Sequence, residues 1–258
     1  MRWVLNHIPT AVLGVVIVAI GVGLGLGLLA FVRRSRIALI DENPPLDILF
    51  AFMGAVYGIM LAFVIVDLWT SFSAARDTVS TEAAALAQLE IDARPLSAPD
   101  RARIDHAMSA YIAAVAGDEV RTMRSGHESR RAHDALDGLA LSLEQSQPTT
   151  KVQDVWYSEA VGKLNDVAVA RRQRIEAAAR NMPTPFRVLI FAGAVLPVGF
   201  ITLVNVQTLR LRTLMVVVVA ALVAYAIFLV VVLEYPFSGT VAVSLEPFRQ
   251  GVLARLSP

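Results

Sequence analysis

The chain has no cysteine, which excludes disulfides, thiolate metal sites and cysteine nucleophiles. Histidine is also scarce, with four residues in all. Two of these, His127 and His133, lie too far apart to share one helix face as the i, i+4 pair of a zinc-protease helix does. A glycine-rich phosphate loop and a serine elbow are missing as well. We therefore expect no enzymatic activity, no catalytic residues, no metal site and no cofactor.

An excess of charge of either sign is also missing. The formal net charge is +1, so the chain lacks the basic surface of a nucleic-acid-binding protein. Apolar residues are abundant instead, at 56% of the chain, with a mean hydropathy of +0.59. This composition is typical of a multi-pass membrane protein. The preference for Arg over Lys, with many Ala and Val, indicates a GC-rich bacterial genome, so we expect the bacterial inner membrane as location and the lipid bilayer as first partner.

Four apolar runs are long enough to cross a bilayer, which takes about 20 residues. The segment between the second and third runs shows helical periodicity and no alternation typical of strands, which predicts a bundle of helices. We therefore predict an all-α membrane protein with a helical extramembrane domain inserted between spans two and three. The expected parts are a transmembrane hairpin over 1–70 (spans 12–32 and 46–68), the helical domain over 71–185, a second hairpin over 186–239 (spans 186–206 and 214–233) and a C-terminal segment over 240–258.

The second span is the segment around which the chain is organised. From residue 46 to about residue 92 no stop signal follows the membrane run, so one helix is expected to continue from the bilayer into water. The inserted domain is expected to contain further helices over 100–120, 129–143 and 152–180. Pro197 in the third span is expected to kink that helix. The nearly balanced charges of the domain indicate solvated helix faces.

Small residues within the spans indicate close helix–helix packing. The pairs are Gly21 with Gly25 in the first span and Gly54 with Gly58 in the second, each at the spacing that lets helices approach closely in lipid. We predict that Gly54→Leu disrupts assembly, because a large side chain blocks this approach.

Other residues of the second span are candidates for lining a conduction path, although a simple surface that packs against lipid or other helices is the favoured interpretation. The candidate pore-lining residues are Met53, Tyr57, Met60 and Asp67. Polar groups expected near membrane ends are candidates for a ring around an oligomeric pore, or are simply interfacial; they are Asn43, Glu82 and Glu234.

Four features together resemble the bacterial bestrophin-like domain family. They are the order of two spans, a helical insert and two more spans; Gly54-xx-Tyr57 with Trp69 at the end of the second span; Val79-Ser80-Thr81-Glu82-Ala83 with Leu86 and Leu89; and Glu234-Tyr235-Pro236-Phe237-Ser238-Gly239 after the fourth span. The last stretch is similar to the Pro-Phe-Gly turn of bestrophins, and its marking residues here are Pro236, Phe237 and Gly239. The resemblance covers nearly the whole chain.

The resemblance implies a pentameric anion channel whose pore is lined mainly by the second span and whose insert faces the cytoplasm. The acidic calcium clasp of animal bestrophins is absent after Gly239, so no calcium gate is expected. Charge predicts the opposite orientation, with the helical domain in the periplasm, although several arginines also flank the third span on the domain side. The N-terminal tail has only Arg2, whereas the short connections carry five arginines. These are Arg33, Arg34, Arg36, Arg210 and Arg212.

Two functions follow from these observations. The first is a bestrophin-like homo-oligomeric ion channel that passes an inorganic ion along the second spans. The second is a membrane-anchored sensor or scaffold whose helical domain binds a ligand or a partner protein. A transporter is disfavoured, because no span carries a charge at its centre and only the third span is interrupted.

Overall fold

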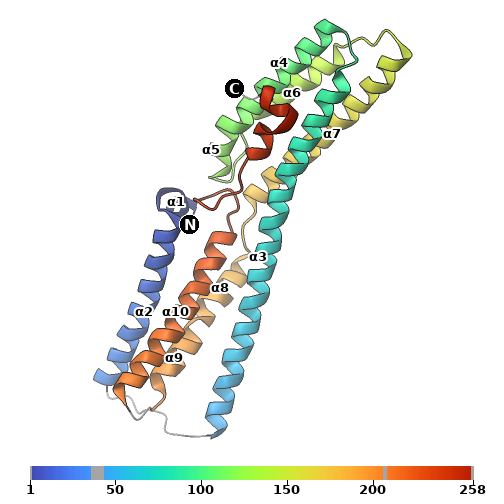
Figure 1. Ribbon diagram of the computed structural model, residues 1–258. Coiled ribbons are helices and arrows are strands. Elements are labelled where there is room, and N and C mark those ends of the chain that lie inside the picture. The colour runs from blue at the N-terminus through green and yellow to red at the C-terminus, as the bar shows by residue number, and fades with distance from the viewer. Residues whose placement is uncertain (1, 36–43, 206–207, 257–258) are drawn as a thin grey trace. The chain divides into compact units, whose positions relative to one another are not determined.

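The computed structural model describes residues 2–35, 44–205 and 208–256, with Pro44 and Asp47 described by their backbone only. Over these residues the protein is built from helices and contains no β-sheet strand, which confirms the predicted all-α class (Figure 1). The chain divides into two compact units. The membrane unit comprises Trp3–Thr70 and Asn181–Glu234, and the helical unit comprises Arg2, Ser71–Arg180 and Tyr235–Pro258.

Four helical segments of the described chain are long and apolar enough to cross a membrane, as predicted. A short helix α1 (Arg2–His7) precedes the first of them. The four are α2 (Thr10–Arg34), the first part of α3 (Pro44–Ala93), the pair α8 (Thr184–Gly193) and α9 (Val195–Leu203), and α10 (Leu209–Leu233).

Helix α3 is continuous over 50 residues, as the missing stop signal predicted. Prolines stand only at its start, where the absent N–H costs nothing, and no Gly or Pro lies between Gly58 and Ala93. The helix ends just before Arg94-Pro95, because the residue before a proline avoids helical backbone angles. This one helix contributes residues to both units.

The third span is interrupted near Pro197, where a kink was expected. Helix α8 ends at Gly193, and α9 begins two residues later at Val195. Pro197 has no N–H to donate to the carbonyl of Gly193 four residues before it, so the regular hydrogen-bond ladder is lost at this point.

Helices α2 and α10 lie side by side within the membrane unit (Figure 1). A Cβ atom on Gly21 would lie 2.5 Å from the Cβ of Ala224, and one on Gly25 would lie 3.1 Å from the Cβ of Ala220. The two glycines therefore stand where the helices approach most closely, and a larger side chain at either would push them apart.

The helical unit consists of α4 (Ala98–Ala114), a π-helical turn η1 (Val115–Glu119), α5 (Val120–Met123), α6 (Arg130–Glu144), α7 (Lys151–Ala179) and the second part of α3. Three of these helices begin at an N-cap residue whose side-chain hydroxyl accepts a hydrogen bond from a backbone N–H of the first turn. The N-cap residues are Ser97, Ser129 and Thr150. The three predicted helices of the insert are thus confirmed within one or two residues, except that the first continues through η1 to Met123.

The C-terminal segment, described up to Leu256, packs into the core of the same unit. Gly239 has a φ of +82°, which L side chains rarely adopt, and this turn leads into two short 3₁₀ helices, η2 (Glu246–Arg249) and η3 (Gly251–Arg255). Phe248 and Leu253 are buried in the apolar core that residues of α3, α4, α6 and α7 form. Arg255 adds an ion pair of 2.8 Å with Glu90 of α3.

Candidate functional site

One face of the membrane part of α3 packs inside its own chain. Tyr57 is buried, and its hydroxyl donates a hydrogen bond of 3.0 Å to the carbonyl of Ile190 in α8. Met53 and Met60 lie one turn to either side of it and are half-buried. Of the four predicted pore-lining residues, these three thus belong to the face that contacts the rest of the membrane unit.

The opposite face of this segment is uncovered. Ile59 is 58% exposed and Phe63 is 72% exposed, and Asp67 follows at the same i, i+4 spacing and is also exposed. Trp69, near the end of the apolar run, is exposed as well. Large apolar side chains on a membrane helix that its own chain leaves uncovered are available to lipid or to a neighbouring subunit.

Gly54 and Gly58 have open space beside them. A Cβ atom built on either glycine would meet no other heavy atom within 4 Å. They differ in this from Gly21 and Gly25, whose space is filled by α10. The two glycines of α3 therefore have no packing role in the single chain.

Of the three predicted membrane-end polar residues, Glu82 and Glu234 can be placed, and they belong to different units. Asn43 lies outside the described residues. Glu234, at the end of α10, accepts a hydrogen bond of 3.1 Å from the backbone N–H of Met182 and forms an ion pair with Arg187 of α8. Glu82 lies in the core of the helical unit, where its side chain has no exposed surface.

The core of the helical unit holds a buried ion-pair network. Arg174 of α7 donates from Nε to Oε2 of Glu82 at 2.6 Å and from Nη2 to Oε1 of the same carboxylate at 2.9 Å. The hydroxyl of Tyr111 in α4 donates to Glu82 as well, at 2.5 Å. Arg174, Glu82 and Tyr111 have no exposed surface, so these bonds form away from water.

A second acid and a second arginine complete this network. Nη2 of Arg174 lies 2.8 Å from Oε2 of Glu119, and Nη2 of Arg171 lies 2.6 Å from Oε1 of Glu119. Glu119 ends the π-helical turn η1, whose extra residue per turn shifts the helix register so that Glu119 and Met123 face the same core as Val115. Two acids and two arginines therefore share this core with no net charge.

Burial and the neighbouring acids act on the pKa of Arg174 in opposite directions and on the pKa of Tyr111 in the same direction. Burial alone lowers the pKa of Arg174, but the neighbouring Glu82 and Glu119 outweigh it, and the net pKa lies above the ordinary value. Burial raises the pKa of Tyr111 well above its usual range, and the negative charge of Glu82 raises it further. Arg174 therefore stays charged and Tyr111 stays a hydrogen-bond donor across physiological pH.

The expectation that the charged side chains of this domain are solvated is wrong for the two acids and two arginines of the network. The reason is that opposite charges at core positions neutralise one another when the helices pack. Arg171 and Arg174 lie on the same face of α7 as Val167, Ala170 and Ala178, which are buried. The signal that could have revealed the network is that two arginines lie on the apolar face of one helix. Two acids, Glu82 and Glu119, lie on the apolar faces of other helical elements and balance their charge.

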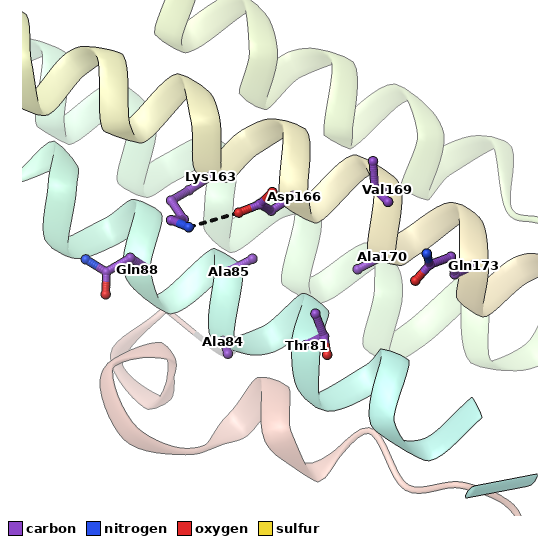
Figure 2. A pocket seen from close by; sticks show the side chains of 9 residues that line it. All are labelled: Thr81, Ala84, Ala85, Gln88, Lys163, Asp166, Val169, Ala170 and Gln173. Carbon is purple, nitrogen blue, oxygen red and sulfur yellow. Dashed lines mark hydrogen bonds and ion pairs between the residues drawn. The ribbon is translucent and has the colours of Figure 1, made fainter. Parts of the chain in front are cut away.

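A groove runs between α3 and α7 on the surface of the helical unit (Figure 2). Its volume is about 700 Å³, and it is open to solvent. Figure 2 shows Thr81 and Gln88 on one wall and Lys163 on the other, where Lys163 pairs with Asp166 at 2.9 Å. The lining combines small apolar side chains with polar and charged ones, and no group of three metal-binding side chains gathers in the described part of the chain.

The turn after the fourth span is well packed. The N–H of Val243 donates to the carbonyl of Pro236 at 2.7 Å, and the hydroxyl of Ser238 donates to the carbonyl of Arg124 at 3.0 Å. Phe237 is buried in the core of the helical unit. The stretch that carried the family resemblance thus attaches the C-terminal segment to this unit, and Gly239 is the residue with the left-handed backbone.

Comparison with protein families and solved structures agrees with this fold. The family model of the bestrophin-like domain matches residues 15–248. Crystal structures of three variants of a bacterial bestrophin homolog from Klebsiella pneumoniae superpose on the chain with TM-scores of 0.69, 0.70 and 0.70, each at 15% sequence identity. They cover 94%, 94% and 97% of this chain, and 97%, 98% and 97% of their own chains. No curated protein matches. At this identity the structural likeness shows a shared fold.

Proposed function

Because the chain belongs to the bestrophin-like domain family, we propose that it forms a homo-oligomeric ion channel whose pore is lined mainly by α3. Family and fold together support an ion channel of this family in general, rather than an enzyme. The observation that carries the proposal is the family match over 15–248, which includes most of the first span, the other three spans and the helical insert.

The uncovered face of α3 is the part of the chain that suits a pore. Tyr57 occupies the inner face, so in a ring of subunits the residues nearest the axis come from the other side of the helix. There Ile59 and Phe63 would form an apolar constriction, and Asp67 would follow as a ring of carboxylates. An apolar constriction gates by excluding water, and a ring of acids attracts cations.

The space beside Gly54 and Gly58 favours close approach of a second copy. Small residues at i, i+4 let the backbones of neighbouring membrane helices come into contact, and nothing in the same chain uses this space. Bestrophins are pentamers, and we propose the same subunit number here.

The first experiment is to determine the subunit number by native mass spectrometry in detergent. A single species of five subunits supports the proposal. A monomer or dimer would rule out a central pore and direct attention to the helical unit.

Liposome flux assays then test conduction itself. Reconstituted protein is expected to dissipate a chloride gradient or a sodium gradient, and the preferred ion follows from the comparison of the two. Protein-free liposomes serve as the blank, and a pentamer that passes neither ion contradicts the channel proposal.

The orientation of the helical unit is a separate proposal. The arginines of the short connections place this unit in the periplasm, whereas the bestrophin resemblance implies the cytoplasm. The chain has no cysteine, so single cysteines at Ser35 and His133, both exposed, can be labelled without background. The charge-based proposal expects an impermeant maleimide to label Cys at position 133 and not at position 35 in spheroplasts; the reverse pattern supports the bestrophin orientation.

The groove between α3 and α7 favours one alternative, a membrane-anchored sensor. Its volume of about 700 Å³ suits a small polar ligand held by amide and hydroxyl groups such as those of Gln88 and Thr81. A monomeric or dimeric protein without flux, whose melting temperature rises with a polar metabolite, would support this function. Replacing Gln88 with Ala should then abolish the rise.

A further inference from the structure

A single guanidinium joins α3 to three other elements of the helical unit. Arg174 donates to both oxygens of Glu82 in α3, to Oε2 of Glu119 in η1 at 2.8 Å, and from Nη1 to the sulfur of Met123 in α5 at 3.1 Å. All three of its nitrogens therefore have partners. The guanidinium also lies 6.0 Å from the ring centroid of Phe248, in the C-terminal segment.

This geometry allows one rotational setting of α3. The planar guanidinium of an arginine donates two hydrogen bonds to one carboxylate only when the two groups are coplanar and face each other. A rotation of α3 by one residue, about 100°, would replace Glu82 by Thr81 or Ala83. It would separate Glu82 from its arginine and leave Arg174 with Glu119 as its one acidic partner, and breaking a buried ion pair is among the most costly changes in a protein core.

Apolar packing of α3 in this region depends on Val79, Leu86 and Leu89, which have no exposed surface, whereas the positions directly after Glu82 are alanines. The residues that follow Glu82 are Ala83, Ala84 and Ala85, whose side chains are alike in size. Ala83 and Ala85 are buried and Ala84 is exposed, so a small rotation exchanges one methyl group for another. The ion pair is the directional contact of this segment and acts together with the apolar contacts of the core.

We propose that Arg174 and Glu82 are positioning residues that hold the rotation of α3 and thereby the alignment of its pore-lining residues. This inference rests on the proposed channel function. Helix α3 has no Gly or Pro between Gly58 and Ala93, so a rotation at Glu82 is transmitted along an unbroken helix to Phe63 and Asp67. The ion pair thus controls conduction without touching the ion.

Two variants separate positioning from stability. Glu82→Gln leaves the core with two arginines and one acid, and it is expected to lower the melting temperature. The double variant Glu82→Gln/Arg174→Gln leaves Arg171 paired with Glu119 and restores charge balance, so it should recover at least half of that loss. Arg174→Lys keeps the charge but loses the planar fork, and it provides the same test if the double variant does not fold.

The rotation is measured by pulsed electron–electron spin resonance. Spin labels on Thr81→Cys in α3 and Gln173→Cys in α7 report on the two walls of the groove, and the chain has no other cysteine (Figure 2). Labels in otherwise unchanged protein are expected to give a narrow distance distribution within one subunit. The double variant should broaden it at least twofold. The matched control is Lys163→Gln/Asp166→Asn, an exposed pair in the same groove, which should leave the width unchanged.

Flux completes the test. The double variant is expected to pass ions at least fivefold more slowly than the unchanged protein at equal reconstitution, even where its melting temperature has recovered. Recovery of distance distribution and flux together with stability would overturn the proposal, because a purely structural role predicts this. If the unchanged protein conducts no ion, the channel proposal fails, and the distance distributions alone decide whether the pair holds α3.

Discussion

Arg174 and Glu82 form a bidentate ion pair without any exposed surface, although they lie 92 positions apart in the chain. The pair joins the long helix α3 to α7, and Tyr111 and Glu119 complete its hydrogen bonds. A buried pair of this kind is costly to break on one side only, because the remaining charge has no partner. This property makes the network testable by substitution.

Arg174→Met is expected to destabilise the helical unit strongly. It leaves Glu82 and Glu119 buried with only Arg171 to balance them, a loss of about 3–5 kcal/mol. For a chain of this size the melting temperature should fall by about 6 °C or more. The matched control is Arg172→Met, because Arg172 is exposed on the same helix. Equal melting temperatures for the two variants in detergent would contradict the buried network.

Gly193→Ala is expected to disturb the packing of α3 on α8. The new Cβ would lie 2.6 Å from the Tyr57 ring, which its hydrogen bond to Ile190 holds in place, so the helices must move apart at a cost of about 1–3 kcal/mol. Gly199→Ala is the control, since its Cβ meets no atom within 4 Å and Ala favours a helix. In thermal unfolding, the melting temperature of Gly193→Ala should be lower than that of the unchanged protein. The melting temperature of Gly199→Ala should be equal to it or higher.

Gly54→Leu is expected to reduce the subunit number. The side chain has room within the single chain, so folding is preserved, but it fills the space proposed for a second copy. Gly27→Leu in α2, where a Cβ also meets nothing, is the matched control. Native mass spectrometry decides: the same oligomer for both variants would argue against an interface at Gly54.

Asp67→Asn is expected to lower the preference of the channel for cations. Removing one carboxylate per subunit from a ring changes the energy of a nearby ion by about 1 kcal/mol, and hence the ratio of sodium to chloride permeability by about threefold to tenfold. Glu144→Gln, an exposed acid at the end of α6, is the control. An unchanged ratio would place Asp67 away from the ion path.

Asp105→Asn is expected to stabilise the helical unit at neutral pH but not at acid pH. Burial raises the pKa of Asp105, and the nearby Glu90 raises it further, against the lowering effect of Arg101, Arg255 and Arg94. The ionised form is therefore penalised in the folded state above the folded pKa, and the penalty vanishes below the unfolded pKa of about 3.9.

The melting temperature of Asp105→Asn should exceed that of the unchanged protein at pH 7 by a few degrees at most, because Asp105 is only half-buried. The difference should disappear near pH 3. Asp134→Asn, an exposed acid on α6, serves as the control. A gain that grows as the pH falls would contradict the direction of the shift.

Much of the fold could be predicted from the sequence because its signals are local. Apolar runs of sufficient length identified the spans, and Ser97, Ser129 and Thr150 stand at the starts of helices, where their hydroxyls accept backbone N–H groups. The interruption near Pro197 followed from the missing N–H of one residue. The packing of the candidate pore-lining residue Tyr57 could not be predicted from local signals. The carbonyl that accepts its hydrogen bond belongs to Ile190, which lies 133 positions away in the chain.

The sequence by itself determined the helices, the apolar spans and the unbroken length of α3, because helix propensity, capping and hydropathy act between residues a few positions apart. Only the tertiary structure decided which face of α3 packs on α8, and which charges are solvated and which are paired in a core. Arg171 and Arg172 are neighbours with the same side chain, yet one is buried against Glu119 and the other is exposed. Their difference depends on acids that are distant in sequence and become neighbours only when the helices pack.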